Sequence, residues 1–411
     1  MSIAAYPKYE SYKDSGISWM PKLPGHWSVY RSKFVFKQSK ELARKDDIQL
    51  SATQSHGVIS QADYETIIGR KVTQIQTNLE KRKHVEIDDF VISMRSFQGG
   101  LERAKAVGCI RSSYVILKPG PLVSPDFYAY LLKMPQYIQA LQLTGNFIRD
   151  GQDLNFENFS DVDLFVPPLP EQRIIAAFLN KKCTKLDEAV RIKEKQIRLL
   201  REHRQILIQQ AVIRGLNPDA SMKDSGIDWI GQIPAHWDIL PLKFIAKLRS
   251  GDTISSEQFA NKGYPVFGGN GFRGYTTKKT HSGHFVLIGR QGALCGNVNY
   301  AQGEFFASEH AIVVSPKIST NITWLGEIIR CSNLNRLSQS AAQPGLSVEV
   351  IGNQRFPLPP IDEQIDISTA IDSRVPKLDS AISIKESQIT ALKEYKGSLI
   401  NAAVTGTIKV I

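Results

Sequence analysis

The segment KLDEAVRIKEKQIRLL, Lys185–Leu200, decides how the chain folds, because it recurs as KLDSAISIKESQITAL at residues 377–392. In both copies apolar residues recur at alternating spacings of four and three, which is the seam pattern of a coiled coil. The seam residues are Leu186, Val190, Ile197, Leu200 and Leu207 in the first copy and Leu378, Ile382, Ile389, Leu392 and Leu399 in the second. The pattern predicts two long helices paired as an antiparallel coiled coil.

Polar residues interrupt both seams at matching positions. Lys193 corresponds to Lys385, and Arg204 corresponds to Lys396. A polar seam residue lowers stability but can fix the register and the partner of a helix. The alternative is that these side chains lie at the helix edge and extend their charge into water.

The bounds of the two helices follow from their capping signals. Pro376 suits only the first turn of a helix, and Thr184 is a plausible cap at the matching place. We therefore expect a short helix near each PEQ or DEQ triplet, then a break, then long helices over Lys185–Arg214 and Lys377–Ala403. At 1.5 Å per residue each long helix spans roughly 40–45 Å.

The flanking sequences repeat as well. DSGISWMPKLPGHWSVYRSKF, from Asp14, returns as DSGIDWIGQIPAHWDILPLKF from Asp224, at an offset of 210 residues. PPLPEQ, from Pro167, returns as PPIDEQ from Pro359, at an offset of 192. The chain is thus expected to be two tandem halves, each with a fixed frame around a different insert. The expected segments are 1–166, 167–216, 217–358 and 359–411, with the inserts in the first and third.

Both inserts read as mixed α/β structure. DDFVISMRSFQGG, from Asp88, and GHFVLIGRQGALCGNVNY, from Gly283, each combine a buried strand with a glycine-containing turn. The predicted fold class is therefore α/β (α+β): two mixed domains, two long paired helices and a pseudo-two-fold tandem repeat. The order of strands within the inserts does not follow from the sequence.

Composition fits a globular protein. Of 411 residues 42% are hydrophobic and 9% aromatic, which is ordinary for a folded chain. Apolar runs stay shorter than the roughly 18 residues of a membrane span, and the first residues lack a signal-peptide pattern. We expect a cytoplasmic protein. Its four cysteines are far apart, so neither a disulfide framework nor a zinc site is indicated.

Positive charge is distributed along the chain. The net charge is +11 and the pI about 9.3. Residues 20–166 hold 19 basic against 16 acidic residues, residues 230–358 hold 12 against 7, and residues 171–214 hold 11 against 5. Such a balance favours a polyanionic partner, and nucleic acid before membrane.

Catalytic motifs are mostly missing. The chain lacks an NPPF-like or DPPY-like methyl-transfer tetrapeptide and a GxxxxGK[ST] phosphate loop. The GxGxxG at Gly269–Gly274 is followed by YTTKKTHSG and lacks the helix that a dinucleotide site needs. His281 and His284 have no third metal ligand nearby, and a nuclease role for Glu394 and Lys396 is weakly supported. No catalytic residue and no metal site are predicted.

The remaining signal is DNA-binding chemistry. Arg and Lys read guanine, Asn and Gln read adenine, and glycines let the backbone approach a ligand. Loops of this composition occur in both inserts. The candidates are Lys81, Arg82, Arg95, Gln98, Arg103 and Lys105 in the first insert and Asn270, Arg273, Tyr275, Lys278, Arg290, Gln291 and Asn297 in the second.

Together, the PPLxEQ and PPIxEQ openings, the KLD-started helices, the lead-ins and the unlike inserts resemble the specificity subunit of type I restriction-modification systems. The resemblance implies two target recognition domains that read the two halves of a split double-stranded DNA site. It also implies two methyltransferase subunits docked on the helices, with restriction subunits added through them. S-adenosylmethionine, ATP and Mg would belong to those partners, and this chain would bind no cofactor and catalyse nothing. The second tail departs from the first: residues 362–403 hold 5 basic against 7 acidic residues, so the docking faces need not be equivalent.

Two other functions stay open at this point. A self-sufficient DNA methyltransferase would bind S-adenosylmethionine alone, and a coiled-coil scaffold would bind no DNA in a salt-sensitive way. If the resemblance holds, the helices act as a ruler that places the half-sites slightly more than one DNA turn apart, since a turn is about 34–36 Å.

Overall fold

The chain divides into two compact units. The computed structural model describes residues 3–72, 79–93, 96–145, 154–292, 294–338 and 345–410. Unit 1 comprises Met1–Ile192 and Gln388–Ile411, and unit 2 comprises Lys193–Ser387. Each unit holds one insert and a stretch of both long helices, and each is described separately below.

Unit 1 combines short strands and short helices. Its elements are η1 (Ile3–Ala5), β1 (Tyr12–Ile17), β2 (Met20–Pro24), β3 (Ser28–Arg31), α1 (Ser32–Val35), β4 (Phe36–Ser39), β5 (Leu50–Thr53), β6 (Gly57–Ser60), α2 (Gln61–Ile68), η2 (Leu79–Lys81), β7 (Lys83–Val85), β8 (Phe90–Ile92), α3 (Ser96–Gly99), β9 (Glu102–Arg103), β10 (Gly108–Ile110), β11 (Val115–Pro119), α4 (Pro125–Leu131), α5 (Pro135–Leu143), α6 (Phe156–Ser160) and β12 (Asp163–Val166). Its largest sheet has the order β4-β11-β8-β9 and is antiparallel throughout.

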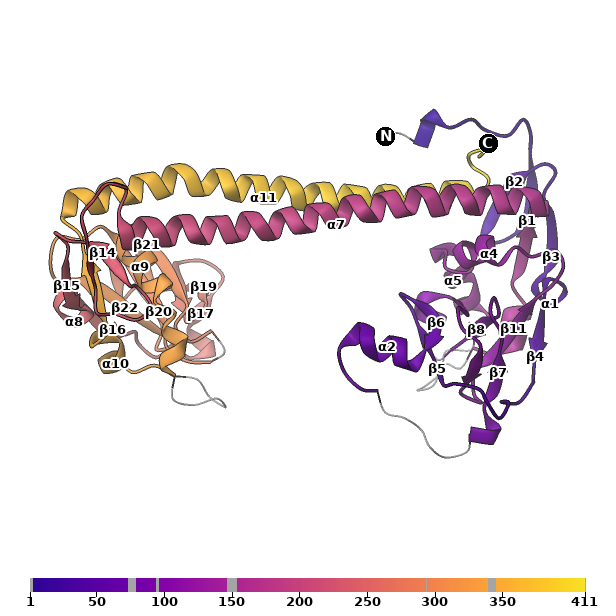
Figure 1. Ribbon diagram of the computed structural model, residues 1–411, viewed down its shortest axis with the longest axis horizontal. Helices are drawn as coiled ribbons and strands as arrows, with labels where there is room; N and C mark the ends of the chain where they lie inside the picture. Colours follow the sequence, from indigo (N-terminus) through magenta and orange to yellow (C-terminus); the bar gives the residue numbers. More distant parts are fainter. Residues whose placement is uncertain are drawn as a thin grey trace. The chain divides into compact units, whose positions relative to one another are not determined.

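The core of unit 1 joins the insert to the helices. Phe36, Tyr128 and Phe159 are fully buried and pack edge to face in its centre. Leu179 of the first long helix and Leu399 of the second belong to the same apolar cluster. In Figure 1, α4 and α5 lie beside the part of α7 that belongs to this unit. Burial of these large side chains therefore fixes the insert on the paired helices.

Unit 2 is built around one larger sheet. Its elements are β13 (Met222–Asp224), β14 (Gln232–Pro234), β15 (Asp238–Pro241), α8 (Leu242–Ile245), β16 (Ala246–Ser250), η3 (Ser256–Gln258), β17 (Phe259–Ala260), β18 (Tyr264–Gly268), β19 (Gly271–Thr276), β20 (His281–Gly289), β21 (Val298–Ala307), β22 (Ala311–Pro316), α9 (Ile322–Cys331), η4 (Leu334–Leu337), α10 (Val348–Gly352) and β23 (Arg355–Leu358). The seven-stranded sheet has the order β16-β22-β20-β21-β18-β19-β17, with β18 and β21 parallel.

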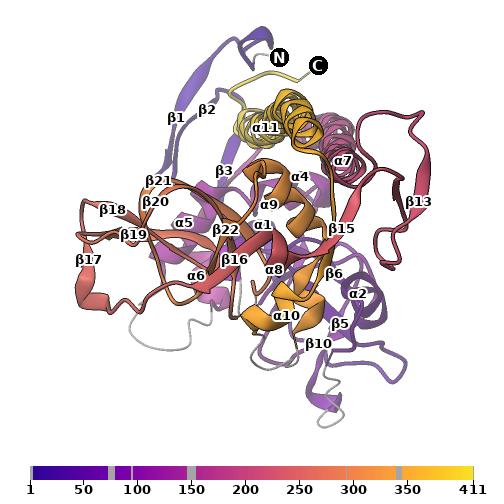
Figure 2. The same cartoon turned by 90° about the vertical axis from the view of Figure 1, so that its left-hand side faces the viewer.

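Helix α9 joins this sheet to the long helices. It begins at Asn321, whose side chain accepts a hydrogen bond from the Trp324 N–H, and it buries Trp324 and Ile328. These residues share an apolar cluster with Val286 of β20 and Ile371 of the second long helix. Figure 2 shows α9 between the sheet and α11. The two inserts thus have different sheets inside a repeated frame, as the sequence predicted.

The long helices are continuous, so the predicted break was wrong. α7 spans Leu169–Arg214 and α11 spans Ile361–Val404, with Pro376 in its interior. An internal proline costs about 3 kcal/mol through its missing N–H and its clash with the preceding turn. Val375 beside it is buried, and Ile371 one turn earlier is buried too, so packing of the apolar edge outweighs that cost. Thr184 does not cap a helix, and its hydroxyl donates to the Asn180 carbonyl one turn earlier.

The predicted seam matches the burial pattern within each unit. In unit 1, Leu186, Val190, Ile389 and Leu392 are half-buried and Leu399 is fully buried. In unit 2, Ile197 and Ile382 are buried, and Leu200, Leu207 and Leu378 are half-buried. α7 and α11 run in opposite directions in Figure 1, as an antiparallel pair. Among the described residues, neither these two helices nor any other helix is both long enough and apolar enough to cross a membrane.

Two of the polar seam residues, Arg204 and Lys396, form ion pairs across the two helices. In unit 2, Arg204 Nε lies 2.9 Å from Asp379 Oδ1, and in unit 1, Lys396 Nζ lies 2.6 Å from Asp187 Oδ1. The two pairs are equivalent under the 192-residue offset, with donor and acceptor exchanged between the helices. For Arg204 and Lys396, specific pairing therefore replaces the alternative of free edge side chains, and it links the KLD aspartate of one copy to the seam of the other.

Candidate nucleic-acid interface

The frame that carries each insert is held by a histidine and a glutamate from the two repeated motifs. In unit 1, His26 Nε2 lies 2.8 Å from Glu171 Oε2. In unit 2, His236 Nε2 lies 2.6 Å from Glu363 Oε1. Each lead-in histidine therefore meets the glutamate that opens the long helix of its own half. This contact explains why the PGHW and PAHW motifs repeat together with PEQ and DEQ.

The glutamine that follows each glutamate fixes the insert to the helix. The side-chain oxygen of Gln172 accepts a 2.8 Å hydrogen bond from the Ser124 N–H, and that of Gln364 accepts a 2.9 Å bond from the Asn321 N–H. Their amide groups donate to the Pro167 and Pro359 carbonyls, each at 2.8 Å. Both glutamines are almost completely buried. They position the insert helices that begin at these backbone groups.

Replacing Gln172 by Ala is expected to lower the free energy of unfolding by about 2 kcal/mol, since buried backbone groups would lose their partners. Urea unfolding followed by circular dichroism measures the change. Gln196→Ala is the matched control, because Gln196 is exposed on the same helix, and it should change stability by less than about 0.5 kcal/mol. Equal effects of the two changes would contradict this role.

A buried tryptophan completes each frame. Trp27 and Trp237 are both fully buried. The glycine that ends the opposite long helix packs against each of them: a Cβ on Gly406 would lie 2.9 Å from Trp27, and one on Gly215 would lie 3.2 Å from Trp237. Both glycines have positive φ, the conformation that ends helices. The repeated lead-ins therefore seat the ends of the helices as well as their starts.

In unit 2 the predicted DNA-binding residues converge at one end of the seven-stranded sheet. Asn297 Nδ2 donates to Asn270 Oδ1 at 3.1 Å, which brings the β18–β19 turn to the start of β21. Gln291 Oε1 lies 3.2 Å from His310 Nδ1, and the Arg290 N–H donates to the His310 carbonyl at 2.9 Å. We call these five residues the amide-arginine cluster. It unites four predicted residues with His310, which sequence reasoning missed because it lies in a separate loop between β21 and β22.

Glycines allow the close packing of these loops. A Cβ on Gly269 would lie 3.1 Å from the His310 carbonyl oxygen, and one on Gly289 would lie 2.5 Å from the Gly269 carbonyl oxygen. Side chains at these positions would push the loops apart. The glycine-rich turn read from the sequence therefore lies close to loops that carry two asparagines, a glutamine and an arginine, which are residue types that read bases, together with a histidine.

The other predicted residues of unit 2 lie along β19 and just after it. Tyr275 is 40% exposed, and Phe272, which sequence reasoning passed over, is 55% exposed; their ring centroids are 5.1 Å apart. The Arg273 guanidinium lies 5.8 Å from the Phe259 ring. Lys278 is exposed beyond the strand end. This surface combines cationic and aromatic side chains and is separate from the hydrogen bonds of the amide-arginine cluster.

In unit 1 the predicted residues are more scattered. Gln98 on α3, Lys81 at the end of η2 and Lys105 after β9 are exposed. Arg95 lies outside the described residues. Arg82 is only 7% exposed and sits beside the Cys109 thiol, whose pKa burial raises despite the nearby guanidinium. Its burial beside this thiol gives Arg82 a structural role in this conformation.

Arg103 also forms ion pairs within the protein. Its guanidinium lies 2.6 Å from Asp88 Oδ1 and 2.5 Å from Asp126 Oδ1. Burial lowers the pKa of Arg103, but the hydrogen bonds to Asp126 and Asp88 outweigh it and raise the pKa above its ordinary value. These two ion pairs link the turn before β8 to α4. We therefore assign Arg103 a role in stabilising the fold of the insert.

A buried histidine stabilises the segment that carries Lys81. His84 is fully buried, with Nδ1 2.8 Å from Asp47 Oδ2 and Nε2 2.8 Å from Glu86 Oε1. Burial lowers its pKa, but the hydrogen bonds to Asp47 and Glu86 prevail and raise the pKa above 6.5. The charged imidazolium is thus favoured in the folded state.

This histidine predicts a pH dependence of stability. A raised folded-state pKa contributes stability that is complete below the unfolded pKa of about 6.5 and is lost as pH rises through the higher folded value. Wild-type stability minus that of His84→Gln should therefore shrink as pH is raised from about 6 through the alkaline side of neutrality. Chemical unfolding of both proteins across this range measures it, and a difference independent of pH would contradict it.

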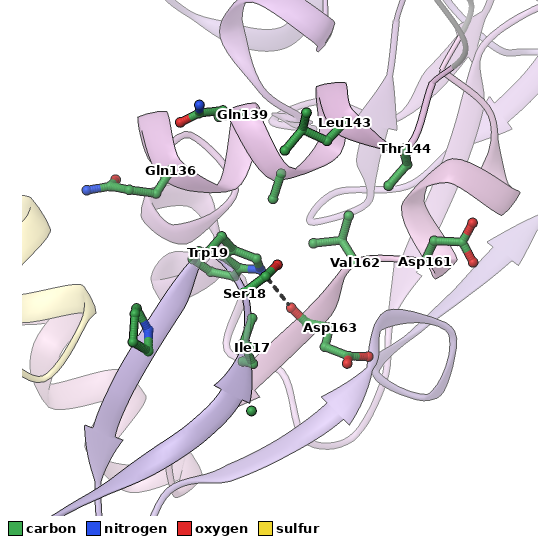
Figure 3. A pocket seen from close by; sticks show the side chains of 13 residues that line it. Ile17, Ser18, Trp19, Gln136, Gln139, Leu143, Thr144, Asp161, Val162 and Asp163 are labelled. Atoms are coloured by element: carbon green, nitrogen blue, oxygen red, sulfur yellow. Dashed lines mark hydrogen bonds between the residues drawn. The ribbon is translucent and has the colours of Figure 1, made fainter.

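Two hollows in unit 1 flank these elements. The first, about 910 Å³, is lined by Lys105, Lys133 and Lys396 among other residues. The second, about 680 Å³, lies between the lead-in hairpin and α5 (Figure 3). There Trp19 Nε1 donates to the Asp163 carbonyl at 3.2 Å. None of the predicted DNA-binding residues lines the second hollow, and groups of three or more potential metal ligands do not occur among the described residues.

The fold and its loops define a class: a tandem-repeat protein in which paired helices carry two unlike α/β modules. Residues 234–394 match the family described as type I restriction modification DNA specificity domain. The chain is 44% identical over 133 residues to the Escherichia coli type I restriction enzyme EcoprrI specificity subunit, a match that covers 31% of this chain and 33% of that protein. It is 24% identical over 334 residues to the MjaVIII specificity subunit of Methanocaldococcus jannaschii, covering 74% of this chain and 75% of that one.

Solved structures show the same fold. A chain from a structure described as the basis of "complex assembly and conformational transition of the type I R-M system" matches with a TM-score of 0.71 at 15% identity, covering 94% of this chain and 99% of that one. The HsdS subunit from Thermoanaerobacter tengcongensis matches with a TM-score of 0.56 at 17% identity, covering 94% and 98%. The resemblance expected from the sequence is confirmed: residues 234–394 match the type I specificity domain, and similarity to type I specificity subunits extends over most of the chain.

Proposed function

We propose that this protein is the DNA-recognition subunit of a type I restriction-modification complex. Each insert reads one half of a split double-stranded DNA target, and the paired helices set the distance between the halves. The observation that carries the proposal is the repeated frame around unlike inserts: the same histidine–glutamate and glutamine–backbone contacts, and the same packing of a glycine against a buried tryptophan, support two different sheets. Two equivalent frames that carry different inserts suit a DNA target whose two halves differ in sequence.

Base reading is proposed for the amide-arginine cluster of unit 2. Arg290 and Gln291 follow β20 at the end of the sheet, with Asn270 and Asn297 beside them, so the cluster contains one guanidinium and three amide groups. These are the groups that read guanine and adenine in the major groove. Arg273, Tyr275 and Lys278 would contact the DNA backbone next to it, since cationic and hydroxyl side chains position a protein on phosphates. In unit 1, Lys81, Arg95, Gln98 and Lys105 are the proposed residues for DNA contact.

The helices would also hold the rest of the complex. Two methyltransferase subunits would dock on α7 and α11, and restriction subunits would join through them. The two faces differ in charge, because residues 171–214 hold 11 basic against 5 acidic residues and residues 362–403 hold 5 against 7. We propose that the chain itself catalyses nothing and binds no cofactor. S-adenosylmethionine, ATP and Mg would be bound by the partner subunits.

Reconstitution tests the proposal. The purified chain should bind DNA in a salt-sensitive manner without binding S-adenosylmethionine, and the methyltransferase subunit should methylate DNA only when the chain is added. Isothermal titration calorimetry measures binding of DNA and of S-adenosylmethionine, and transfer of tritiated methyl groups to DNA measures methylation. Methylation by the chain alone would show an enzyme in its own right, and salt-independent or absent DNA binding would show a scaffold.

A further inference from the structure

An exposed phenylalanine flanked by lysines occurs at equivalent places in the two lead-ins. The lead-ins end in KFVFK, residues 33–37, and KFIAK, residues 243–247, at the same offset of 210 residues. Phe34 is 70% exposed and Phe244 is 58% exposed. We call these two segments the KF patches. Large aromatic side chains so exposed at equivalent places in two modules point to a shared use.

Folding of the lead-in does not require these two rings. α1 buries Val35 toward the core of unit 1, and α8 buries Ile245 toward the core of unit 2. The phenylalanine beside each of them points outward instead. Exposure of a ring of this size forgoes the favourable free energy that its burial would contribute. Binding to a partner would recover that free energy.

The lysine that precedes each phenylalanine lies close to its ring in the same way. Lys33 Nζ lies 5.4 Å from the Phe34 ring centroid, and Lys243 Nζ lies 5.5 Å from the Phe244 centroid. Lys37 in β4 and Lys247 in β16, three residues after each phenylalanine, are exposed as well. Each patch is therefore an apolar centre with a cationic rim, and the complementary surface is an apolar pocket edged by carboxylates.

We propose that the KF patches are docking sites for the two methyltransferase subunits, one patch for each subunit. The inference rests on the proposed function and adds a second contact to the helical docking face. The patches belong to the fixed frame, so they suit a partner present in two identical copies. A protein pocket fits better than DNA, because an aromatic ring gains little against phosphates, whereas aromatic residues are enriched at the centres of protein interfaces.

Titration of the methyltransferase subunit into the full-length chain tests the proposal. Wild type should bind two subunits. Phe34→Ala and Phe244→Ala should each weaken one of the two sites by about tenfold, and the double variant should weaken both. Native mass spectrometry gives the stoichiometry, and fluorescence titration gives the affinities. Lys33→Glu and Lys243→Glu should act in the same direction, more strongly at low salt.

Ile67→Ala is the matched control, because Ile67 is 52% exposed and its counterpart at the 210 offset is Thr277. It should leave both affinities unchanged. Unaltered binding of two subunits by the double phenylalanine variant would overturn the proposal, as would a loss of DNA affinity in the chain alone, which would assign the patches to DNA. Failure of wild type to bind any methyltransferase subunit would instead refute the proposed function itself.

Discussion

Inserting seven residues into each long helix should lengthen the non-specific gap of the DNA target by about three base pairs. Seven residues add about 10 Å to a helix, and base pairs are about 3.4 Å apart. The insertions would follow Ile192 in α7 and Ser387 in α11, which lie between the Asp187–Lys396 and Arg204–Asp379 pairs in sequence. Because seven residues keep the four-three seam in phase, both pairs should be retained. Methylation mapping of the variant measures the gap.

The control for this prediction is the same insertion in one helix only. Beyond the insertion, the residues of one helix would be shifted by seven positions along the other, and the ion pairs across the helices could not all form. We therefore expect loss of stability and of methylation rather than a longer gap. An unchanged gap in the stable double insertion would refute the idea that the helices act as a ruler.

Replacing Arg290 by Ala should relax one half of the DNA target and leave the other half intact. A guanidinium that reads a base contributes about 1–3 kcal/mol of discrimination, so preference at one position should fall by about 5-fold to 150-fold. Competition binding with targets altered at single positions in each half measures the preference. A uniform loss across both halves would indicate contact with phosphate instead.

Arg103→Ala provides the contrast in the other unit. Because its guanidinium holds Asp88 and Asp126, its removal should lower the stability of unit 1 and should not alter a single base preference. A selective change of one base position with unchanged stability would return Arg103 to the DNA-reading group.

The paired helices could be predicted from the sequence because their information is local and periodic. Each seam residue lies three or four positions from the next, so the pattern is visible without knowledge of the fold. The continuity of α11 could not be predicted, since the cost of Pro376 is local whereas the compensating burial of Ile371 and Val375 depends on the packed structure. Tertiary packing outweighed a local rule.

The frame was visible as a repeat but its contacts were not. His26 and Glu171 are 145 residues apart in the chain, and nothing in either motif names the other as its partner. The order of the sheet strands escaped prediction for the same reason: the strands are short, and their pairing is set by contacts between distant segments. Two motifs that repeat together are, in retrospect, the signal that could have suggested contact.

The candidate DNA-binding residues show the limit of composition. A run such as Lys81, Arg82 and Lys83 has the same charge whether its side chains face water or the core, and the structure buries Arg82 while exposing Lys81. In unit 2 the glycine-rich segments were informative because glycine marks places where loops approach closely. Four of the seven residues predicted there lie in one cluster: Asn270 bonds to Asn297, and Arg290 and Gln291 both bond to His310.

Genome-wide mapping of methylated bases, in cells with and without this chain, tests the central claim most directly. The claim is that the two different inserts, carried by one pair of helices, read the two halves of a split DNA target. It predicts methylation that depends on the chain and falls in a motif of two specified parts separated by a gap of fixed length and free sequence. A single uninterrupted motif, or a gap of variable length, would contradict it.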